Sequence, residues 1–268
     1  MLQRWRQGRV KAARFGAEGY RAYAIGDVHG RLDLLEGLLK QIEADHRARG
    51  GDVTPVLVFL GDLIDRGPQS REVVEKVVAG ALPGFQTVVL AGNHEEVLVR
   101  LLDGEEELLP EWLRFGGAEC LQSYGLDPSA LLAIPELAAL EQLRAAIPAA
   151  HNRFLGSLAD TFRFGDYLFV HAGIRPGIPL EAQSPVDLRW IRQPFLGDRR
   201  DHGLMIVHGH TIKQEIDEQP NRIGIDTGAH HFGVLTALGI EGAERWFLQQ
   251  DEAALAEGAV QTDPQPCT

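Results

Sequence analysis

The octapeptide at residues 61–68 reads Gly61-Asp62-Leu63-Ile64-Asp65-Arg66-Gly67-Pro68. It directly follows an apolar run, residues 55–60, that is rich in β-branched side chains and long enough for one buried strand. In open α/β sheets, ligands bind at the carboxyl ends of the strands, which is where this loop would lie. Two carboxylates and a guanidinium so close together are costly to bury unless they bind something. For the octapeptide alone, a salt-bridged turn is the alternative explanation.

A unit of the same kind precedes the octapeptide. Residues 21–25 are predicted to form a strand, which leads into Gly26-Asp27-Val28-His29-Gly30, and leucines at helical spacing follow. Asp27 and His29 stand at i and i+2, so on extended backbone both side chains point to one side. A carboxylate and an imidazole together are typical metal ligands. For this pair alone, a helix cap and a surface histidine are the alternative.

A third unit follows the octapeptide. Residues 85–90 are predicted to form a strand, Asn93 and His94 come in the loop after it, and a helix is predicted over residues 97–102. Right-handed parallel crossovers would bring the three strand ends to one edge of one sheet. The three polar loops are therefore expected to meet.

The second half of the chain adds two histidine-bearing strand ends. Leucine- and alanine-rich segments broken by prolines predict a helical insertion at about residues 103–160. A hairpin at residues 161–170 leads to His171, and a strand at residues 204–207 ends in His208-Gly209-His210. Finally, residues 222–226 and 233–240 are predicted to be strands of a second sheet, which residues 244–248 close.

Composition narrows the class of protein. The chain has 268 residues, of which 44% are hydrophobic and 24% charged, as in ordinary globular proteins. Its net charge of -12 argues against a general nucleic-acid-binding surface. No apolar run approaches the roughly 20 residues that a membrane span needs, so no membrane partner is expected. Two cysteines and the lack of an apolar signal segment predict a cytoplasmic protein, with a monomer as the default.

The domain organisation is predicted to be simple. Residues 20–250 are expected to form one catalytic domain that carries the helical insertion. Residues 1–19 are basic and too irregular for an amphipathic helix, so a loosely ordered extension is expected there. Residues 251–268 are predicted to be a disordered acidic tail.

Six side chains of the strand-end loops are candidate metal ligands: Asp27, His29, Asp62, Asn93, His171 and His210. Two carboxylates, one amide oxygen and three imidazoles suit two divalent cations, provided that one carboxylate bridges them. Two dications and two carboxylates leave a charge of about +2, which matches the roughly -1.5 to -2 of a phosphate monoester at pH 7. The composition of the site thus predicts a phosphorylated substrate.

Five motifs in order resemble the PPP-family metallophosphatases, and most of all their bacterial and phage serine/threonine protein phosphatases. These motifs are Gly26-Asp27-Val28-His29-Gly30, Gly61-Asp62 with Asp65-Arg66-Gly67, Gly92-Asn93-His94-Glu95, His171-Ala172-Gly173 and Gly209-His210-Thr211. The resemblance implies an α/β fold, namely a four-layer α/β/β/α metallophosphoesterase sandwich with two mixed sheets and a dinuclear site between them. It also implies two divalent metal ions, with manganese expected and iron or zinc as alternatives.

The same resemblance implies roles for the site residues. Asp27 and His29 would hold the first metal, and Asp62 would bridge to the second, whose other ligands would be Asn93, His171 and His210. Arg66 would grip phosphate, since a guanidinium pairs with phosphate through two hydrogen bonds. A second arginine is expected, for which Arg192 fits best and Arg175 and Arg189 are the alternatives. The metals would activate a water for in-line attack, and His94, oriented by Asp65, would protonate the leaving group.

The function expected from these roles is hydrolysis of phosphomonoesters, with phosphoserine or phosphothreonine of a phosphoprotein or phosphopeptide as substrate. A symmetrical diadenosine tetraphosphate hydrolase is the main alternative, and by resemblance such enzymes typically carry alanine where this chain has Asp65. A non-catalytic scaffold on the same fold is the third possibility. Outside the motifs, surface positions are expected for five histidines: His46, His151, His202, His230 and His231. A supporting role near the site is considered for His208.

Overall fold

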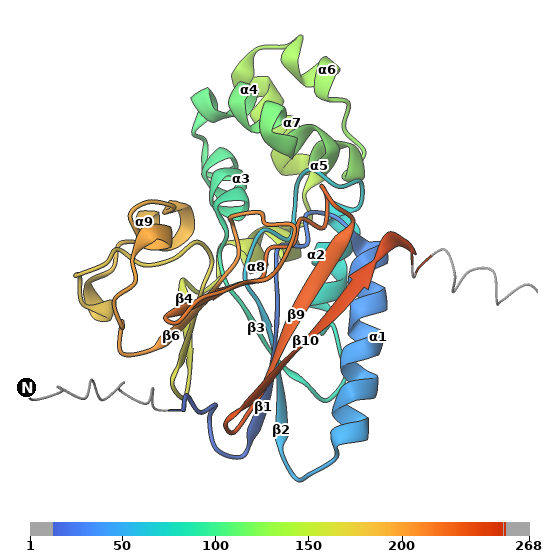
Figure 1. The fold of residues 1–268 in the computed structure, drawn as a ribbon. Coiled ribbons are helices and arrows are strands. Elements are labelled where there is room, and N and C mark those ends of the chain that lie inside the picture. Colours follow the sequence, from blue (N-terminus) through green and yellow to red (C-terminus); the bar gives the residue numbers. More distant parts are fainter. Residues whose placement is uncertain (1–12, 254, 256–268) are drawn as a thin grey trace, which may run out of the picture.

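Two five-stranded mixed sheets pack face to face in the computed structural model, which describes residues 13–253 and 255 (Figure 1). The first sheet has the order β10-β9-β1-β2-β3. Its strands are β1 (Tyr20–Ile25), β2 (Thr54–Phe59), β3 (Gln86–Val89), β9 (Val234–Glu241) and β10 (Glu244–Asp251). The second has the order β4-β5-β6-β8-β7. Its strands are β4 (Thr161–Phe164), β5 (Tyr167–Val170), β6 (Met205–His208), β7 (Asp217–Glu218) and β8 (Arg222–Gly224).

Successive side chains of a strand point to opposite faces of its sheet. In both sheets one set packs in the core between the sheets and the other packs on the outer side. In β1, Ala22 and Ala24 face the other sheet, while Tyr23 and Ile25 face the helices. In β5, Phe169 points between the sheets, and Val170 packs on the opposite side. Full burial of a side chain such as Ile25, Phe169 or Val170 stabilises the fold by about 1.5–3 kcal/mol relative to an exposed position. The predicted α/β architecture with two mixed sheets is confirmed.

Helices cover the first sheet and extend beyond its strand ends (Figure 1). The long helix α1 (Leu32–Arg49) and the shorter α2 (Ser70–Val78) pack on the outer face, and α3 (Asn93–Asp103) leads into the insertion. The insertion contains η1 (Glu106–Leu108), α4 (Leu109–Trp112), η2 (Leu113–Gly117), α5 (Ala118–Ser123), α6 (Pro128–Leu132), α7 (Glu136–Ala146) and α8 (Ala149–Leu155). It is helical, as predicted. The outer side of the second sheet carries η3 (Leu180–Ala182), α9 (Pro185–Trp190) and η4 (Phe195–Gly197).

The assignment of the last two strands to the second sheet is wrong. Strand β9 pairs antiparallel with β1, with Ala22 opposite Ile240, and β10 pairs with β9. Both therefore extend the first sheet. Apolar alternation in a strand specifies which side chains face inward, but not the strand with which it pairs. The choice of partner depends on packing against elements more than 200 residues earlier in the chain.

The described part of the predicted amino-terminal extension contacts the body of the fold. Gly16 N–H donates to Gly242 O at 2.8 Å, and Asp166 N–H donates to Phe15 O at 2.8 Å. Residues 1–12 of the predicted extension and all of the predicted tail except residues 251–253 and 255 lie outside the described residues. Within the described chain, no helix is long and apolar enough to cross a membrane.

Candidate active site

Loops from both sheets meet at the carboxyl ends of the strands, as the sequence predicts. Strands β1, β2 and β3 are parallel, so the loops that follow them lie at one edge. Val28 N–H and His29 N–H both donate to Asp62 O, at 3.0 and 2.8 Å, and these bonds join the first two loops. His210 N–H donates to Asp27 Oδ2 at 2.9 Å, which links the second sheet to the first. These bonds bring the loops of Asp27, His29, Asp62 and His210 together.

Asp62 lies between two groups of donors, with one carboxylate oxygen directed at each. Its Oδ2 is 3.5 Å from His29 Nε2, and its Oδ1 is 3.5 Å from His171 Nε2. The group on the first side is His29, Asp62 and His94, and the group on the second is Asp62, His171 and His210; within each, the ligand atoms lie within 4.8 Å of one another. This arrangement suits a carboxylate shared by two cations.

Two imidazoles are oriented by the backbone for metal binding. His29 Nδ1–H donates to Ile64 O and His171 Nδ1–H to Leu60 O, both at 2.8 Å, which leaves each Nε2 lone pair directed at Asp62. Metal-ligating histidines in proteins are held in the same way. Burial lowers the pKa of both imidazoles, and the neutral form is the one that binds a metal.

The other candidate ligand atoms, on Asp27, Asn93 and His210, have polar capacity that neighbouring protein groups in the described chain do not use. Asn93 Oδ1 lies 3.0 Å from His171 Nε2 and 2.8 Å from His210 Nδ1. Asp27 Oδ1 and His210 Nε2 are buried with no hydrogen-bond partner among the described residues. A Cβ on Gly92 would lie 2.1 Å from Asp62 Oδ1, so only glycine leaves room for this carboxylate. The donor set and its spacing fit a pair of divalent cations.

The backbone at three of these residues is left-handed, which is uncommon outside glycine. The φ angles are 46° at His29, 48° at Asp62 and 62° at His210. Such conformations cost of order 1 kcal/mol or more each and cluster at functional sites, where surrounding contacts maintain them.

Glu95 provides such contacts for Asp62, although the sequence analysis assigned it no role. Its buried carboxylate accepts hydrogen bonds from Asp62 N–H at 2.8 Å, Leu63 N–H at 2.7 Å and Gly92 N–H at 2.9 Å. Its place three residues after Gly92 matches the position from which a glutamate returns to the start of its helix. This spacing is the feature of the sequence from which the role of Glu95 could have been predicted.

Replacing Glu95 with glutamine is expected to lower the free energy of unfolding by about 1–3 kcal/mol, because an amide cannot accept all of these buried N–H groups. Urea denaturation of the purified protein measures this loss. Glu105→Gln, at an exposed position paired with Arg100, is the control and should change stability little. Equal stability of Glu95→Gln and the unmodified protein would contradict the assigned role.

His94 and Asp65 form a buried pair. His94 Nδ1–H donates to Asp65 Oδ2 at 2.6 Å. Burial disfavours the protonated imidazole, but the carboxylates of Asp62 and Asp65 outweigh it and raise the pKa of His94. The guanidinium of Arg66 lies next to this pair, with its Nη2 3.0 Å from His94 Nε2. Because a guanidinium can only donate, His94 Nε2 accepts this hydrogen bond in the present arrangement. The structure brings the three residues together, and their roles as proton donor, orienting carboxylate and phosphate-binding arginine remain predictions.

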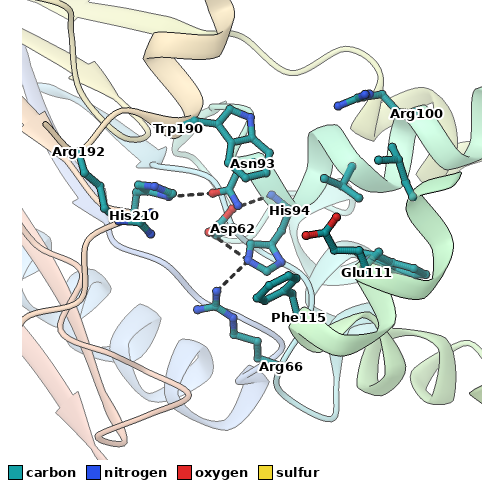
Figure 2. A pocket seen from close by; sticks show the side chains of 13 residues that line it. Asp62, Arg66, Asn93, His94, Arg100, Glu111, Phe115, Trp190, Arg192 and His210 are labelled. Carbon is teal, nitrogen blue, oxygen red and sulfur yellow. Dashed lines mark hydrogen bonds and ion pairs between the residues drawn. The ribbon is translucent and has the colours of Figure 1, made fainter. Parts of the chain in front are cut away.

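Among the three candidates for the second arginine, the structure favours Arg192. Its guanidinium makes no hydrogen bond or ion pair with the described residues, and it lines the same pocket as Asp62 and His210. Arg175 instead pairs with Asp187 at 2.8 Å, and Arg189 pairs with Asp160 at 2.7 Å. Figure 2 shows Arg192 and Arg66 on different sides of Asp62.

This pocket has a volume of about 420 Å³ and extends from the candidate ligands to the insertion. Two partly exposed aromatic rings line it: Phe115, at 57% exposure, comes from η2, and Trp190, at 38%, ends α9. In the view of Figure 2 they lie below and above Asp62 and Asn93. A pocket of this size with apolar walls and a polar floor is typical of small-molecule sites.

Of the five histidines expected at the surface, only His231 is exposed, whereas His46, His202 and His230 are half-buried and His151 is buried. His230 Nε2 lies 3.4 Å from Arg66 Nη1, and its ring packs 4.8 Å from that of His29. His151 is buried against the hydroxyl of Tyr124. His231 is exposed, as expected. The loop after β8 also brings in Asp226, which had no assigned role; burial raises its pKa to about 6. No local motif marks either His230 or Asp226, because they reach the site only through the packing of the loop after β8 against loops far earlier in the chain.

His208 is buried next to the site without lining the pocket. Its Nδ1–H donates to Gly209 O at 3.0 Å, and its Nε2 accepts from Arg222 at 3.2 Å. It therefore supports the loop that carries His210.

Comparisons with known proteins agree with this geometry. The family model described as calcineurin-like phosphoesterase matches residues 20–233. The asymmetrical bis(5'-nucleosyl)-tetraphosphatase PrpE of Anoxybacillus flavithermus is 30% identical over 80% of this chain and 88% of its own length. A symmetrical bis(5'-nucleosyl)-tetraphosphatase of Janthinobacterium sp. is 26% identical over 81% and 92%, respectively. The crystal structure of a candidate diadenosine tetraphosphatase superposes with a TM-score of 0.62 over 90% of this chain and all of that chain, at 20% identity, which shows a shared fold.

Proposed function

The chain belongs to the calcineurin-like phosphoesterase family, and from that premise we propose that it hydrolyses a phosphoanhydride bond of a dinucleoside tetraphosphate with two divalent cations. The matches to nucleosyl-tetraphosphatases over four fifths of the chain support this substrate class. They favour the alternative expected from the sequence, a symmetrical diadenosine tetraphosphate hydrolase, over phosphoserine or phosphothreonine hydrolysis. The asymmetrical PrpE relative adds a mode of cleavage that the sequence did not predict.

The observation that carries the proposal is the placement of Phe115 and Trp190 in the pocket with the candidate ligands. Stacking of a nucleobase on an aromatic ring contributes about 1–3 kcal/mol per base. Arg66 and Arg192 line the same pocket, and guanidinium groups pair with phosphate through charge-assisted hydrogen bonds. A phosphoserine side chain has no aromatic group for these rings to bind.

In this mechanism Asp27 and His29 would hold one cation, and Asn93, His171 and His210 the other, with Asp62 between them. When bound, the cations would supply activation of water and neutralisation of phosphate charge. Arg66 and Arg192 would hold phosphate oxygens from two sides. Where the leaving oxygen is strongly basic, His94 would give it the Nε2 proton, while Asp65 keeps the imidazole in the orientation that this transfer requires. A nucleoside phosphate, as a weak base, depends little on this proton.

Incubation of the purified protein with diadenosine tetraphosphate and Mn²⁺ is expected to release ATP and AMP, the asymmetrical products, as resolved by ion-exchange chromatography. Phe115→Ala and Trp190→Ala should each raise KM for this substrate about 10-fold, since each removes one stacking partner. Neither should change KM for p-nitrophenyl phosphate to the same extent. Phe15→Ala, which removes an equally exposed ring outside the pocket, is the matched control.

Release of two ADP molecules would show symmetrical cleavage, as the name of the Janthinobacterium relative describes, with the substrate class unchanged. Turnover of phosphopeptides with no cleavage of the dinucleotide would refute the proposal.

Phosphoserine or phosphothreonine hydrolysis is the second candidate, and the Asp65–His94 pair favours it. An alkoxide is a poor leaving group and needs a proton, whereas a nucleoside phosphate leaves readily. A phosphopeptide panel assayed beside the dinucleotide therefore distinguishes the two. The use of manganese, a cytoplasmic location, a monomeric state and the lack of nucleic-acid or membrane partners remain predictions.

A further inference from the structure

The helical insertion reaches the Asp65–His94 pair through a tryptophan. Trp112, at the end of α4, is 3% exposed, and its Nε1–H donates to Asp65 Oδ2 at 2.8 Å. The same oxygen accepts from His94 Nδ1–H at 2.6 Å. Asp65 itself is fully buried. Asp65 Oδ2 therefore links the insertion, through Trp112, to His94.

A second bond attaches the insertion to Arg66. Gly116 O accepts from Arg66 N–H at 2.9 Å. The helix is interrupted at this point, with φ -97° and ψ 15° at Phe115 and φ 115° and ψ 0° at Gly116. The interruption turns the Gly116 carbonyl away from a regular helical bond and toward Arg66. A Cβ at Gly116 would lie 2.5 Å from Arg66 Cγ, so the approach requires glycine.

The loop that receives these bonds is strained. Asp65 and Arg66 are consecutive residues with φ 71° and 69°, a left-handed conformation that costs roughly 1–2 kcal/mol for each non-glycine residue. Ser70 Oγ accepts from Asp65 N–H at 2.9 Å and provides one restraint from within the loop's own helix. His94 restrains the Asp65 carboxylate from α3, and two further restraints, from Trp112 and Gly116, come from the insertion.

We propose that Trp112 is a positioning residue for hydrolysis: its indole N–H fixes the Asp65 carboxylate, which in turn aims His94 Nε2 at the leaving oxygen. In the step it serves, a water oxygen bonds to phosphorus as the P–O bond to the leaving group breaks. The leaving oxygen takes the Nε2 proton of His94, and the proton released by the water restores His94 through solvent. The inference rests on phosphoester hydrolysis at this centre and not on the nucleoside part of the proposed substrate.

The test compares two aryl phosphates that contain no nucleoside. Trp112→Phe is expected to lower kcat on phenyl phosphate about 10- to 100-fold, the effect of losing a hydrogen bond to a charged group. On p-nitrophenyl phosphate, whose leaving group needs little protonation, the loss should stay below about 3-fold. Because neither substrate carries a nucleobase, this comparison can be made even if diadenosine tetraphosphate is not cleaved.

Trp246→Phe is the matched control, since Trp246 Nε1–H donates to Asp45 at 3.0 Å and lies outside the pocket. It removes the same kind of bond and should leave the ratio of the two rates unchanged. In an Asp65→Ala background, Trp112→Phe should have no further effect, because its partner is gone. Equal losses on both aryl phosphates, or a full additional loss in the Asp65→Ala background, would overturn the proposal.

A second measurement does not depend on folding of the Trp112 variant. In protein labelled with ¹⁵N-tryptophan and loaded with metal, the Trp112 indole N–H resonance should shift and exchange faster with solvent in Asp65→Ala than in the unmodified protein. The Trp246 resonance should remain unchanged. A Trp112 resonance that does not respond to loss of the Asp65 carboxylate would also overturn the proposal.

Discussion

Asp62→Asn is expected to reduce turnover about 1,000-fold or more on every substrate that the protein hydrolyses, since cation stabilisation contributes several kcal/mol and each 1.4 kcal/mol is about tenfold. The reason is the placement of its two oxygens, 3.5 Å from His29 on one side and 3.5 Å from His171 on the other. An amide offers only one oxygen and no charge, so both donor groups lose their shared ligand. Loss of either histidine alone would disturb only one group and should cost less.

Metal content and kcat measured on the same preparations test this expectation. Chelation of the unmodified protein should abolish hydrolysis, and Mn²⁺ should restore it. Asp45→Asn is the control, because that carboxylate accepts a hydrogen bond from Tyr23 away from the pocket. Full activity of metal-free protein, or of Asp62→Asn with unchanged metal content, would remove the basis for a dinuclear centre.

His94→Asn is expected to lower kcat/KM about 100- to 10,000-fold on an ester with a strongly basic leaving group, the usual contribution of a positioned acid. Phosphoserine peptides and phenyl phosphate are such substrates. On p-nitrophenyl phosphate the loss should be much smaller, because nitrophenolate leaves without a proton. Asp65→Ala should show the same selectivity, since the 2.6 Å bond from His94 Nδ1 to Asp65 orients the imidazole.

The effect of His94→Asn is also expected to differ between the substrates of the two candidate functions. With diadenosine tetraphosphate, whose leaving group is a weak base, His94→Asn should cost about as little as with p-nitrophenyl phosphate. His231→Asn, at an exposed position outside the pocket, is the control for removal of an imidazole. Identical losses on all four substrates would show that His94 does not protonate the leaving group.

The site was predictable from sequence where its residues stand at strand ends. Each apolar run followed by a glycine-bearing loop implies a strand and a turn, and parallel pairing of β1, β2 and β3 then forces those loops together. The loops that carry Asp27, Asp62 and Asn93 meet for this reason: Val28 N–H donates to Asp62 O, and His94 N–H donates to Asp62 Oδ1. The helical character of the insertion likewise follows from its composition.

The tertiary structure decided what local pattern does not encode. It assigned β9 and β10 to the first sheet and brought His230 to Arg66. Within the described part of the chain, it also left the guanidinium of Arg192 unpaired, while Arg175 and Arg189 are paired. It also placed Trp112 against Asp65, 47 residues away in the chain. Periodicity and turn residues report the conformation and the buried face of each segment, because these depend on neighbours in sequence. Pairing of strands, ion pairs and contacts between loops depend on which segments meet after folding, and only the packed chain determines that.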